Sequence, residues 1–299
     1  MDRFDASPRG PFSLANERQF FGEWLSLASD PDAVVMAFPV EGWLGSAAVV
    51  VRQAADGSID GTVSTTGGAP PERAWAQALA TLSLDVDGSG FPDVGVRDEI
   101  VGDLQERYAW LRPVCFHSPY EAAVNFVVGQ RISMRQARAI RARLARELGE
   151  AIVVDGEAIH AFPAPDVLAG LEAFEGIPDA KLARLRGIAR AAGDGLLDRE
   201  RLRALPVEDA LTELMRLRGV GPFAAQGILH RGAGLVDAVT DDDVTREAVG
   251  LAYGLGDRPS QGDVLAIAEP WRPYRMWATV LLHVWLRRER GGPTRAQGR

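Results

Sequence analysis

The chain has 299 residues, of which 46% are hydrophobic and 25% are charged, and its formal net charge is −8. This composition indicates a globular protein of one large domain or two, and it excludes a fibrous repeat and wholesale disorder. The single cysteine, Cys115, excludes a disulfide framework, a thiolate zinc site and an iron–sulfur cluster. With no signal sequence and no membrane-spanning run, the chain is expected to be soluble and cytoplasmic, in the nucleoid if it binds DNA.

The acidity lies entirely in the N-terminal part of the chain. Residues 1–118 contain 8 basic and 17 acidic residues, whereas residues 119–299 contain 25 and 24. A net negative charge argues against a nucleic-acid partner, but this argument applies to the first part alone. The second part is close to neutral, so a local basic surface there remains open.

Short β-branched runs near the N-terminus predict an antiparallel sheet, because turn formers separate them. We expect an α/β domain over residues 1–84, followed by a connecting segment, 85–118, that packs against the helical part. The predicted strands are 34–40, 47–51 and 61–64, and the predicted helices of this domain are 16–27 and 71–82.

From Pro119 to residue 290 the pattern becomes helical nearly throughout, and residues 291–299 are expected to form a flexible tail. Pro119 suits the first turn of a helix that starts after Ser118 and ends near Gly129. The next helix has an apolar stripe and an arginine-rich opposite face, which predicts a solvated amphipathic helix. Its apolar residues are Ala137, Ile140, Leu144 and Leu148, and its arginines include Arg135, Arg138, Arg143 and Arg146.

Residues 211–229 predict two helices joined by a tight turn, the first stopping at Gly219 and the second starting at Pro222. Backbone N–H groups at such a turn are uncovered and form an anion site suited to a DNA phosphate. Arg216 and Arg218 lie beside the turn and add positive potential. A plain connection between two helices is the alternative interpretation.

The turn and the residues around it carry a resemblance to a known family. The sequence Leu-Arg-Gly-Val-Gly-Pro-Phe-Ala-Ala at 217–225, followed by an acidic cluster, resembles the helix-hairpin-helix (HhH-GPD) DNA glycosylase superfamily. Val-Gly-Gln-Arg-Ile-Ser at 128–133 and Glu-Pro-Trp-Arg-Pro-Tyr-Arg at 269–275 match two further motifs in the same order. His230-Arg231-Gly232 and Asp237 fall in register with the DNA-3-methyladenine glycosylase II (AlkA-like) branch.

The resemblance implies an α+β fold, in which a TATA-binding-protein-like antiparallel sheet domain precedes a mostly α-helical HhH-GPD domain. It implies an enzyme that hydrolyses the N-glycosidic bond of alkylated purines of the 3-methyladenine type in base-excision repair. Its partner would be double-stranded DNA with damaged bases, and the protein would be a monomer with no membrane contact. Lyase members have a Lys where this chain has Phe223, which favours a monofunctional glycosylase.

The resemblance implies that the target nucleotide is flipped out of the duplex and that an aspartate stabilises the oxocarbenium charge on the sugar or activates water. Alignment with the alkyladenine branch places Asp243 at this position, and alignment with the endonuclease III pattern places Asp241 there. Overall resemblance favours Asp243. The loop lacks the Pro of that branch, and Arg246 stands where it has an apolar residue. A purely structural role, as a helix cap and dipole-favoured acids, is the alternative.

The resemblance also assigns binding residues. Arg131 matches the residue that wedges into the gap left by the flipped base, and a solvent-exposed turn arginine is the alternative. Gly227 replaces an aromatic residue, which predicts a base pocket that is wider or less electron-rich. Core packing is the alternative for Trp277. No cofactor is required, but a monovalent cation at hairpin carbonyl groups is expected. The residues implied are Gln130, Arg131, Arg218, Gly219, Val220 and Gly221 for DNA, Phe223, Tyr274 and Trp277 for the base, and Met215, Leu217 and Val220 for the cation.

The altered acidic loop and Gly227 leave a second function open. The chain would then be a catalytically impaired helix-hairpin-helix protein that binds damaged DNA. A protein-interaction module unrelated to DNA is the least favoured interpretation.

Overall fold

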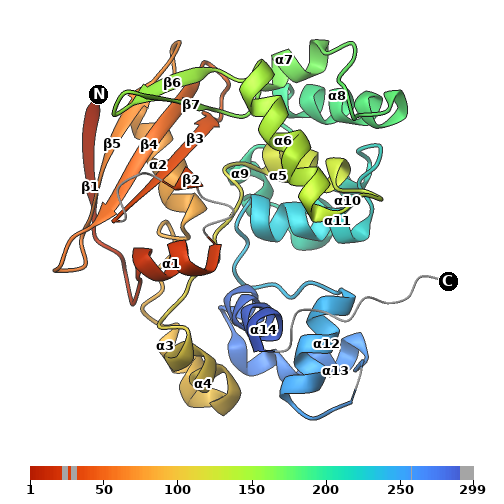
Figure 1. Ribbon diagram of the computed structural model, residues 1–299. Coiled ribbons are helices and arrows are strands. Elements are labelled where there is room, and N and C mark those ends of the chain that lie inside the picture. Colours follow the sequence, from red (N-terminus) through yellow and green to blue (C-terminus); the bar gives the residue numbers. More distant parts are fainter. Residues whose placement is uncertain (22–25, 28–31, 257, 290–299) are drawn as a thin grey trace.

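The computed structural model describes residues 1–21, 26–27, 32–256 and 258–289. Its N-terminal part is a five-stranded antiparallel sheet of order β1-β5-β4-β3-β2 (Figure 1). The α+β class and the three predicted strands, here β3 to β5, are confirmed, as is the second predicted helix, α2. The elements of this part are β1 (Asp2–Ala6), α1 (Leu14–Phe21), β2 (Ser26–Leu27), β3 (Ala33–Pro39), β4 (Ser46–Gln53), β5 (Ile59–Thr65) and α2 (Pro71–Thr81).

The first predicted helix is shorter than expected. The helix α1 ends at Phe21, and residues 26–27 form β2, whose Ser26 pairs with Val35 of β3. Residues 22–25 of the expected helix lie outside the described residues. The sequence also gave no prediction of β1, which pairs with β5 along its whole length. Both edge strands are short or polar, so their sequences lack the apolar run that marks a buried strand.

The two faces of the sheet are covered by different parts of the chain. Because side chains alternate along a strand, Val34 and Met36 join the core on one face, whereas Val35 packs on the other. That second face contacts Ile152 and Val154 of β6. Gly61 of β5 leaves room for the helix on the first face, since a Cβ there would lie 2.4 Å from the ring of Trp75.

The strand β6 belongs to a hairpin, β6 (Ala151–Val154) and β7 (Glu157–His160), inside the region predicted to be helical. Its turn residues, Asp155 and Gly156, have φ values of 49° and 85°. An Asp-Gly pair with two positive φ angles is typical of a two-residue hairpin turn, so the signal was present in the sequence. The hairpin lies against the sheet and joins it to the helical part.

The helices between residues 119 and 232 gather around α5, which is buried along most of its length. It begins where the sequence predicted, with the Ser118 side chain accepting a hydrogen bond from the Glu121 backbone (3.1 Å), and Gly129 is its C-cap. The elements of this cluster are α5 (Pro119–Val128), α6 (Met134–Leu148), α7 (Pro165–Gly170), α8 (Asp179–Gly193), α9 (Arg199–Ala204), α10 (Val207–Met215), α11 (Pro222–Gly227) and the π-helix η1 (Ile228–Gly232).

The C-terminal helices form a group of their own, in which Figure 1 shows α14 beside α12, below the sheet. Their buried residues, such as Leu281, share one hydrophobic core with the sheet and with α3 and α4. Buried residues between Tyr120 and Ala233, apart from those of the β6–β7 hairpin, form a second core, so the helical region expected over 119–290 is divided between two cores. The elements added are α3 (Pro92–Arg97), α4 (Glu99–Arg107), α12 (Asp243–Ala252), α13 (Gln261–Ile267), the 3-10 helix η2 (Glu269–Trp271) and α14 (Arg275–Glu289).

The expected domain boundaries stay a prediction, and the expected tail at 291–299 lies outside the described residues. Among the helices that the structure describes, none combines the length and the apolar character needed to cross a bilayer.

Candidate DNA-binding and catalytic site

The predicted hairpin is formed by α10 and α11. The helix α11 begins at Pro222 as expected, but α10 ends at Met215, before Gly219. The turn between them is closed by backbone hydrogen bonds, including one from the Val220 N–H to the Leu217 carbonyl (2.9 Å). Gly219 has a φ of 97°, and a Cβ there would lie 2.7 Å from Cδ of Arg184. The positive φ therefore favours glycine at this position, and the arginine side chain would have to shift to admit a larger residue.

Gln130 links this hairpin to the turn that follows α5. Its Nε2 donates to the Gly219 carbonyl (2.6 Å), and its Oε1 accepts from Nη1 of Arg184 (3.0 Å). Nζ of Lys181 donates to the carbonyls of Val128 (2.8 Å) and Gln130 (2.9 Å). The structure thus gives Gln130 a positioning role between two turns. Lys181 and Arg184 of α8 were not predicted, although two basic residues three apart on a helix share one face.

Exposed arginines surround the two turns. Arg131 has a φ of 60°, a conformation uncommon for a residue other than glycine, and such outliers cluster at functional sites. Arg131, Arg216 and Arg218 are all exposed and form no hydrogen bond or ion pair within the described residues. Their guanidinium groups are available to an anionic ligand.

The three consecutive aspartates have three different environments. Oδ1 of Asp241 accepts hydrogen bonds from Nε (2.9 Å) and Nη2 (2.6 Å) of Arg246. Asp242 is the N-cap of α12 and accepts from the Thr245 backbone (2.7 Å). Asp243 is the first residue of α12, is exposed, and has no partner in the part of the chain that the structure describes. Only Asp243 therefore presents an uncommitted carboxylate, at a helix end that favours negative charge.

The loop that carries these aspartates is attached to α11 and η1. The Asp241 N–H donates to Oε1 of Gln226 (3.0 Å), and Nδ1 of His230 lies 2.9 Å from Oγ1 of Thr240. Burial lowers the pKa of His230 to about 4, so its ring is neutral at physiological pH. These contacts fix the loop along one side of the helix.

A cavity of about 430 Å³ lies beside the same helix, between α11 and the helices α5 and α6. Phe223, which is 57% exposed, lines it and packs edge to face on Phe126 at a centroid distance of 5.6 Å. A Cβ on Gly227 would lie 2.1 Å from Cζ of Phe126. The pocket is therefore not wider at Gly227 as expected, because the Phe126 ring occupies that space. Phe126 was not predicted to line the site.

Tyr274 and Trp277 lie elsewhere, in the core that the sheet and α14 share. Trp277 is 1% exposed, and the Arg112 guanidinium lies 5.0 Å from its ring. The Tyr274 hydroxyl donates to the Asp87 carbonyl (2.6 Å), and both rings contact Phe91. The structure thus does not assemble these two residues with Phe223 into one cavity, because α14 packs into the other core. Their contact with a base stays a prediction.

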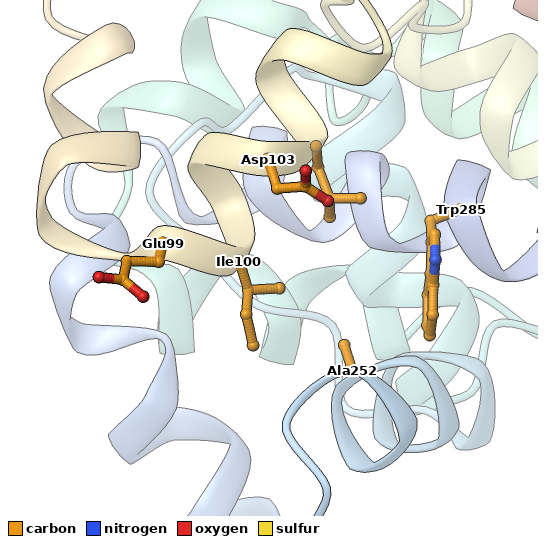
Figure 2. A pocket seen from close by; sticks show the side chains of 6 residues that line it. Glu99, Ile100, Asp103, Ala252 and Trp285 are labelled. Carbon is orange, nitrogen blue, oxygen red and sulfur yellow. The ribbon is translucent and has the colours of Figure 1, made fainter.

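A second cavity, of about 250 Å³, lies between α4, α12 and α14. Figure 2 shows Trp285 and Ala252 facing Ile100, with the carboxylates of Glu99 and Asp103 on the α4 side. None of the predicted site residues lines this cavity, so it is not part of the candidate site.

The chain is similar in sequence to named glycosylases. It is 31% identical over 220 residues to DNA-3-methyladenine glycosylase 2 of Escherichia coli, a match that covers 70% of this chain and 71% of the relative. The chain belongs to the DNA-3-methyladenine glycosylase family. It is also 26% identical over 207 residues to the DNA-3-methyladenine glycosylase of Bacillus subtilis, covering 67% of this chain and 68% of the relative. No protein-family model matches the chain.

The fold agrees with this assignment. The 3-methyladenine DNA glycosylase of Archaeoglobus fulgidus superposes with a TM-score of 0.77 at 20% identity, covering 95% of this chain and 98% of that one. The protein is thus an AlkA-like member of the helix-hairpin-helix glycosylases, a DNA-binding enzyme of DNA repair. These relatives do not favour the alternative of a damage-binding protein that has lost catalysis.

Proposed function

We propose that this glycosylase is monofunctional and hydrolyses the N-glycosidic bond of alkylated purines of the 3-methyladenine type in base-excision repair. The observation that carries the proposal is the uncommitted carboxylate of Asp243 at the N-terminus of α12. Asp241 is engaged by Arg246, and Asp242 caps the helix. Asp243 is accordingly the catalytic residue of the proposal.

The chemistry requires one carboxylate and little acid assistance. The bond between C1′ and the base nitrogen breaks, and its electron pair leaves with the base, so a cationic alkylated base departs neutral. Asp243 stabilises the oxocarbenium charge on the sugar or accepts a proton from the water whose oxygen bonds to C1′. Phe223 has no amine, so an imine intermediate is not expected.

The turns beside this carboxylate supply the DNA contacts. The N–H groups of the turn at Gly219 and Gly221 bind a phosphate, with Arg218 adding charge, and Val220 holds the turn in shape because its N–H donates to the Leu217 carbonyl. Arg131 fills the gap in the base stack, and the flipped base stacks on Phe223. Gln130 acts by holding the two turns at a fixed separation, since both ends of its amide are bonded within the protein.

A monovalent cation at the hairpin belongs to the same proposal. Carbonyl oxygens of Met215, Leu217 and Val220 would hold it and so strengthen the anion site. The Leu217 carbonyl already accepts one N–H, from Val220, but a carbonyl oxygen has two lone pairs, so a bound cation is compatible with the turn. No cofactor is needed for the hydrolysis itself.

The test is an excision assay on duplexes that contain 3-methyladenine, 7-methylguanine, ethenoadenine or hypoxanthine. We expect release of free base from the two alkylated purines and no covalent adduct on borohydride treatment. Tight binding without release from any of the four duplexes would overturn the proposal, and an adduct would overturn its monofunctional part.

A further inference from the structure

The aspartate segment, residues 240–245, is held by a histidine at each end. At its start, Nδ1 of His230 in η1 lies 2.9 Å from Oγ1 of Thr240. At its end, Nε2 of His283 in α14 lies 3.0 Å from Oγ1 of Thr245. The three aspartates lie between the two threonines. The segment is therefore attached on both sides to elements that are distant from each other in the sequence.

The two attachments lead to different hydrophobic cores. The helix η1 contributes Ile228 to the core around α5, which also contains Val220 of the hairpin turn. The helix α14 contributes Leu281 to the core shared with the sheet, and α12 packs into that core through Ala248 and Val249. The turns proposed to bind DNA thus belong to one core, whereas the helix that carries the proposed catalytic carboxylate belongs to the other.

The two histidines are neutral and are suited to rigid attachment. Burial lowers the pKa of both rings, to about 4 for His230, so each ring has one N–H and one acceptor nitrogen at physiological pH. A threonine hydroxyl can bond to either nitrogen. His230 is 3% exposed and Thr245 is fully buried, so loss of a hydroxyl leaves a polar atom without its partner away from water.

Hydrogen bonds of the aspartate segment extend this constraint to both neighbours of Asp243. The Asp241 N–H donates to Oε1 of Gln226 (3.0 Å), and Asp242, the N-cap of α12, accepts from the Thr245 N–H (2.7 Å). The Asp243 carboxylate itself has no partner among the described residues. The backbone around Asp243 is thus fixed on both sides, while its carboxylate is available to a substrate.

We propose that the two histidine–threonine pairs position the Asp243 carboxylate relative to the turns that bind DNA. The inference rests on the proposed function, because it takes Asp243 as the catalytic residue. His230 and His283 are then positioning residues, which act through the threonines and touch neither sugar nor base. A displacement of a reacting group by about 1 Å can lower a rate by about 10²-fold. Since the DNA-binding turns belong to the other core, the pairs should set the rate of base release and not the affinity for DNA.

The experiment removes each threonine hydroxyl and measures rate and affinity separately. In Thr240→Val/Thr245→Val we expect the single-turnover rate constant for 3-methyladenine release to fall by about 10- to 100-fold, and by less in each single variant. The Kd for duplex DNA should stay within about twofold of the wild-type value. Thr245→Ser keeps the hydroxyl and should keep the rate constant within about threefold.

Thr81 offers a matched control. Its Oγ1 lies 3.3 Å from Nδ1 of His117, another ring whose pKa is lowered by burial, to about 3. This pair joins α2 to the residues just before α5 and lies outside the aspartate segment. Thr81→Val should therefore lower the melting temperature, as the test variants do, and leave both the rate constant and the Kd at their wild-type values.

Two results would overturn the inference. One is a rate constant within about threefold of wild type in the double variant or, if that variant does not fold, in both single Val variants. The other is an equal loss of rate and affinity in the test variants and in Thr81→Val, since general destabilisation would then explain it. If the wild type releases no base, the proposed function fails and amide hydrogen exchange decides the inference. Protection of residues 241–246 should fall in the Val variants, and unchanged protection would overturn the positioning role.

Discussion

The arginines on the two sides of α11 differ in whether they are paired with carboxylates. On the turn side, Arg131, Arg216 and Arg218 are exposed and unpaired within the described residues. On the side of the acidic loop, arginines are paired with carboxylates, as Arg246 is with Asp241 and as Arg272 and Arg275 are with Asp237. A paired charge contributes to structure and an unpaired one remains available to a ligand. Of the groups compared, Asp243 and the three exposed arginines are left available to a ligand, which is what the proposed DNA contact requires.

The largest effect is expected at Asp243. Asp243→Asn removes the charge but keeps the size, so base release should fall by about 10²- to 10⁴-fold while affinity for duplex DNA is kept or raised. The measurement is single-turnover release of 3-methyladenine together with a binding isotherm. Asp241→Asn is the control, and we expect a smaller loss there because this carboxylate already pairs with Arg246. Undiminished release in both variants would remove the distinction between paired and free aspartates.

Glu121 is a buried carboxyl paired with Arg141, and its ionisation should affect stability. Its carboxyl has a pKa of about 7 in the folded protein and an ordinary value of 4.5 when unfolded, because burial disfavours the charged form. Between pH 4.5 and about 7 the Glu121 carboxyl is therefore protonated in the folded protein and ionised in the unfolded chain. Its contribution to the stability of the folded protein is full below pH 4.5 and is lost as the pH rises through about 7.

The measurement for Glu121 is the free energy of unfolding, followed from pH 4.5 to pH 8 in wild type and in Glu121→Gln. The difference between the two should shift against the wild type by up to about 3 kcal/mol over this range, from a shift of 2 to 3 pKa units. Taking the difference removes the opposite contribution of His117 and His230, whose pKa values burial lowers. Parallel curves would show that Arg141 compensates the charge fully.

Gly219 tests the geometry of the turn side. Gly219→Ala places a Cβ at a positive φ and against Arg184, a strain of about 1–2 kcal/mol that should weaken DNA binding by roughly tenfold. Gly156→Ala is the matched control, since Gly156 also has a positive φ, of 85°, but lies in the turn of the β6–β7 hairpin with no atom within 4 Å of an added Cβ. Fluorescence anisotropy on one duplex measures both. Equal losses would mean that the turn conformation does not set affinity.

The smallest effect is expected for a single surface cation. Arg218→Ala should lower affinity for all duplexes alike and reduce the slope of log K against log salt by about one. The acidic N-terminal part should keep affinity for undamaged duplex modest in both proteins. Strong retention of the wild type on undamaged duplex at high salt would contradict this view of the charge distribution.

Local signals predicted much of the structure. Alternation and turn formers located β3, β4 and β5, and Ser118, Pro119 and Gly129 defined α5, because caps and breakers act within a few residues. The Asp-Gly turn of the β6–β7 hairpin was an equally local signal. The hairpin was not predicted because the sequence on both sides of it has a helical pattern. The end of α10 at Met215 was missed because the hydrogen bonds of the following turn do not depend on residue type.

The candidate site depended on tertiary contacts more than on local sequence signals. The sequence by itself determined the family motifs, the three aspartates and the basic residues around the hairpin. Only the tertiary structure decided which aspartate is free, that Phe126 fills the space above Gly227, that Tyr274 and Trp277 join the other core, and that Arg141 faces a cavity. These outcomes depend on contacts between segments far apart in the chain, where packing and ion pairing select among side chains that the sequence presents as equivalent.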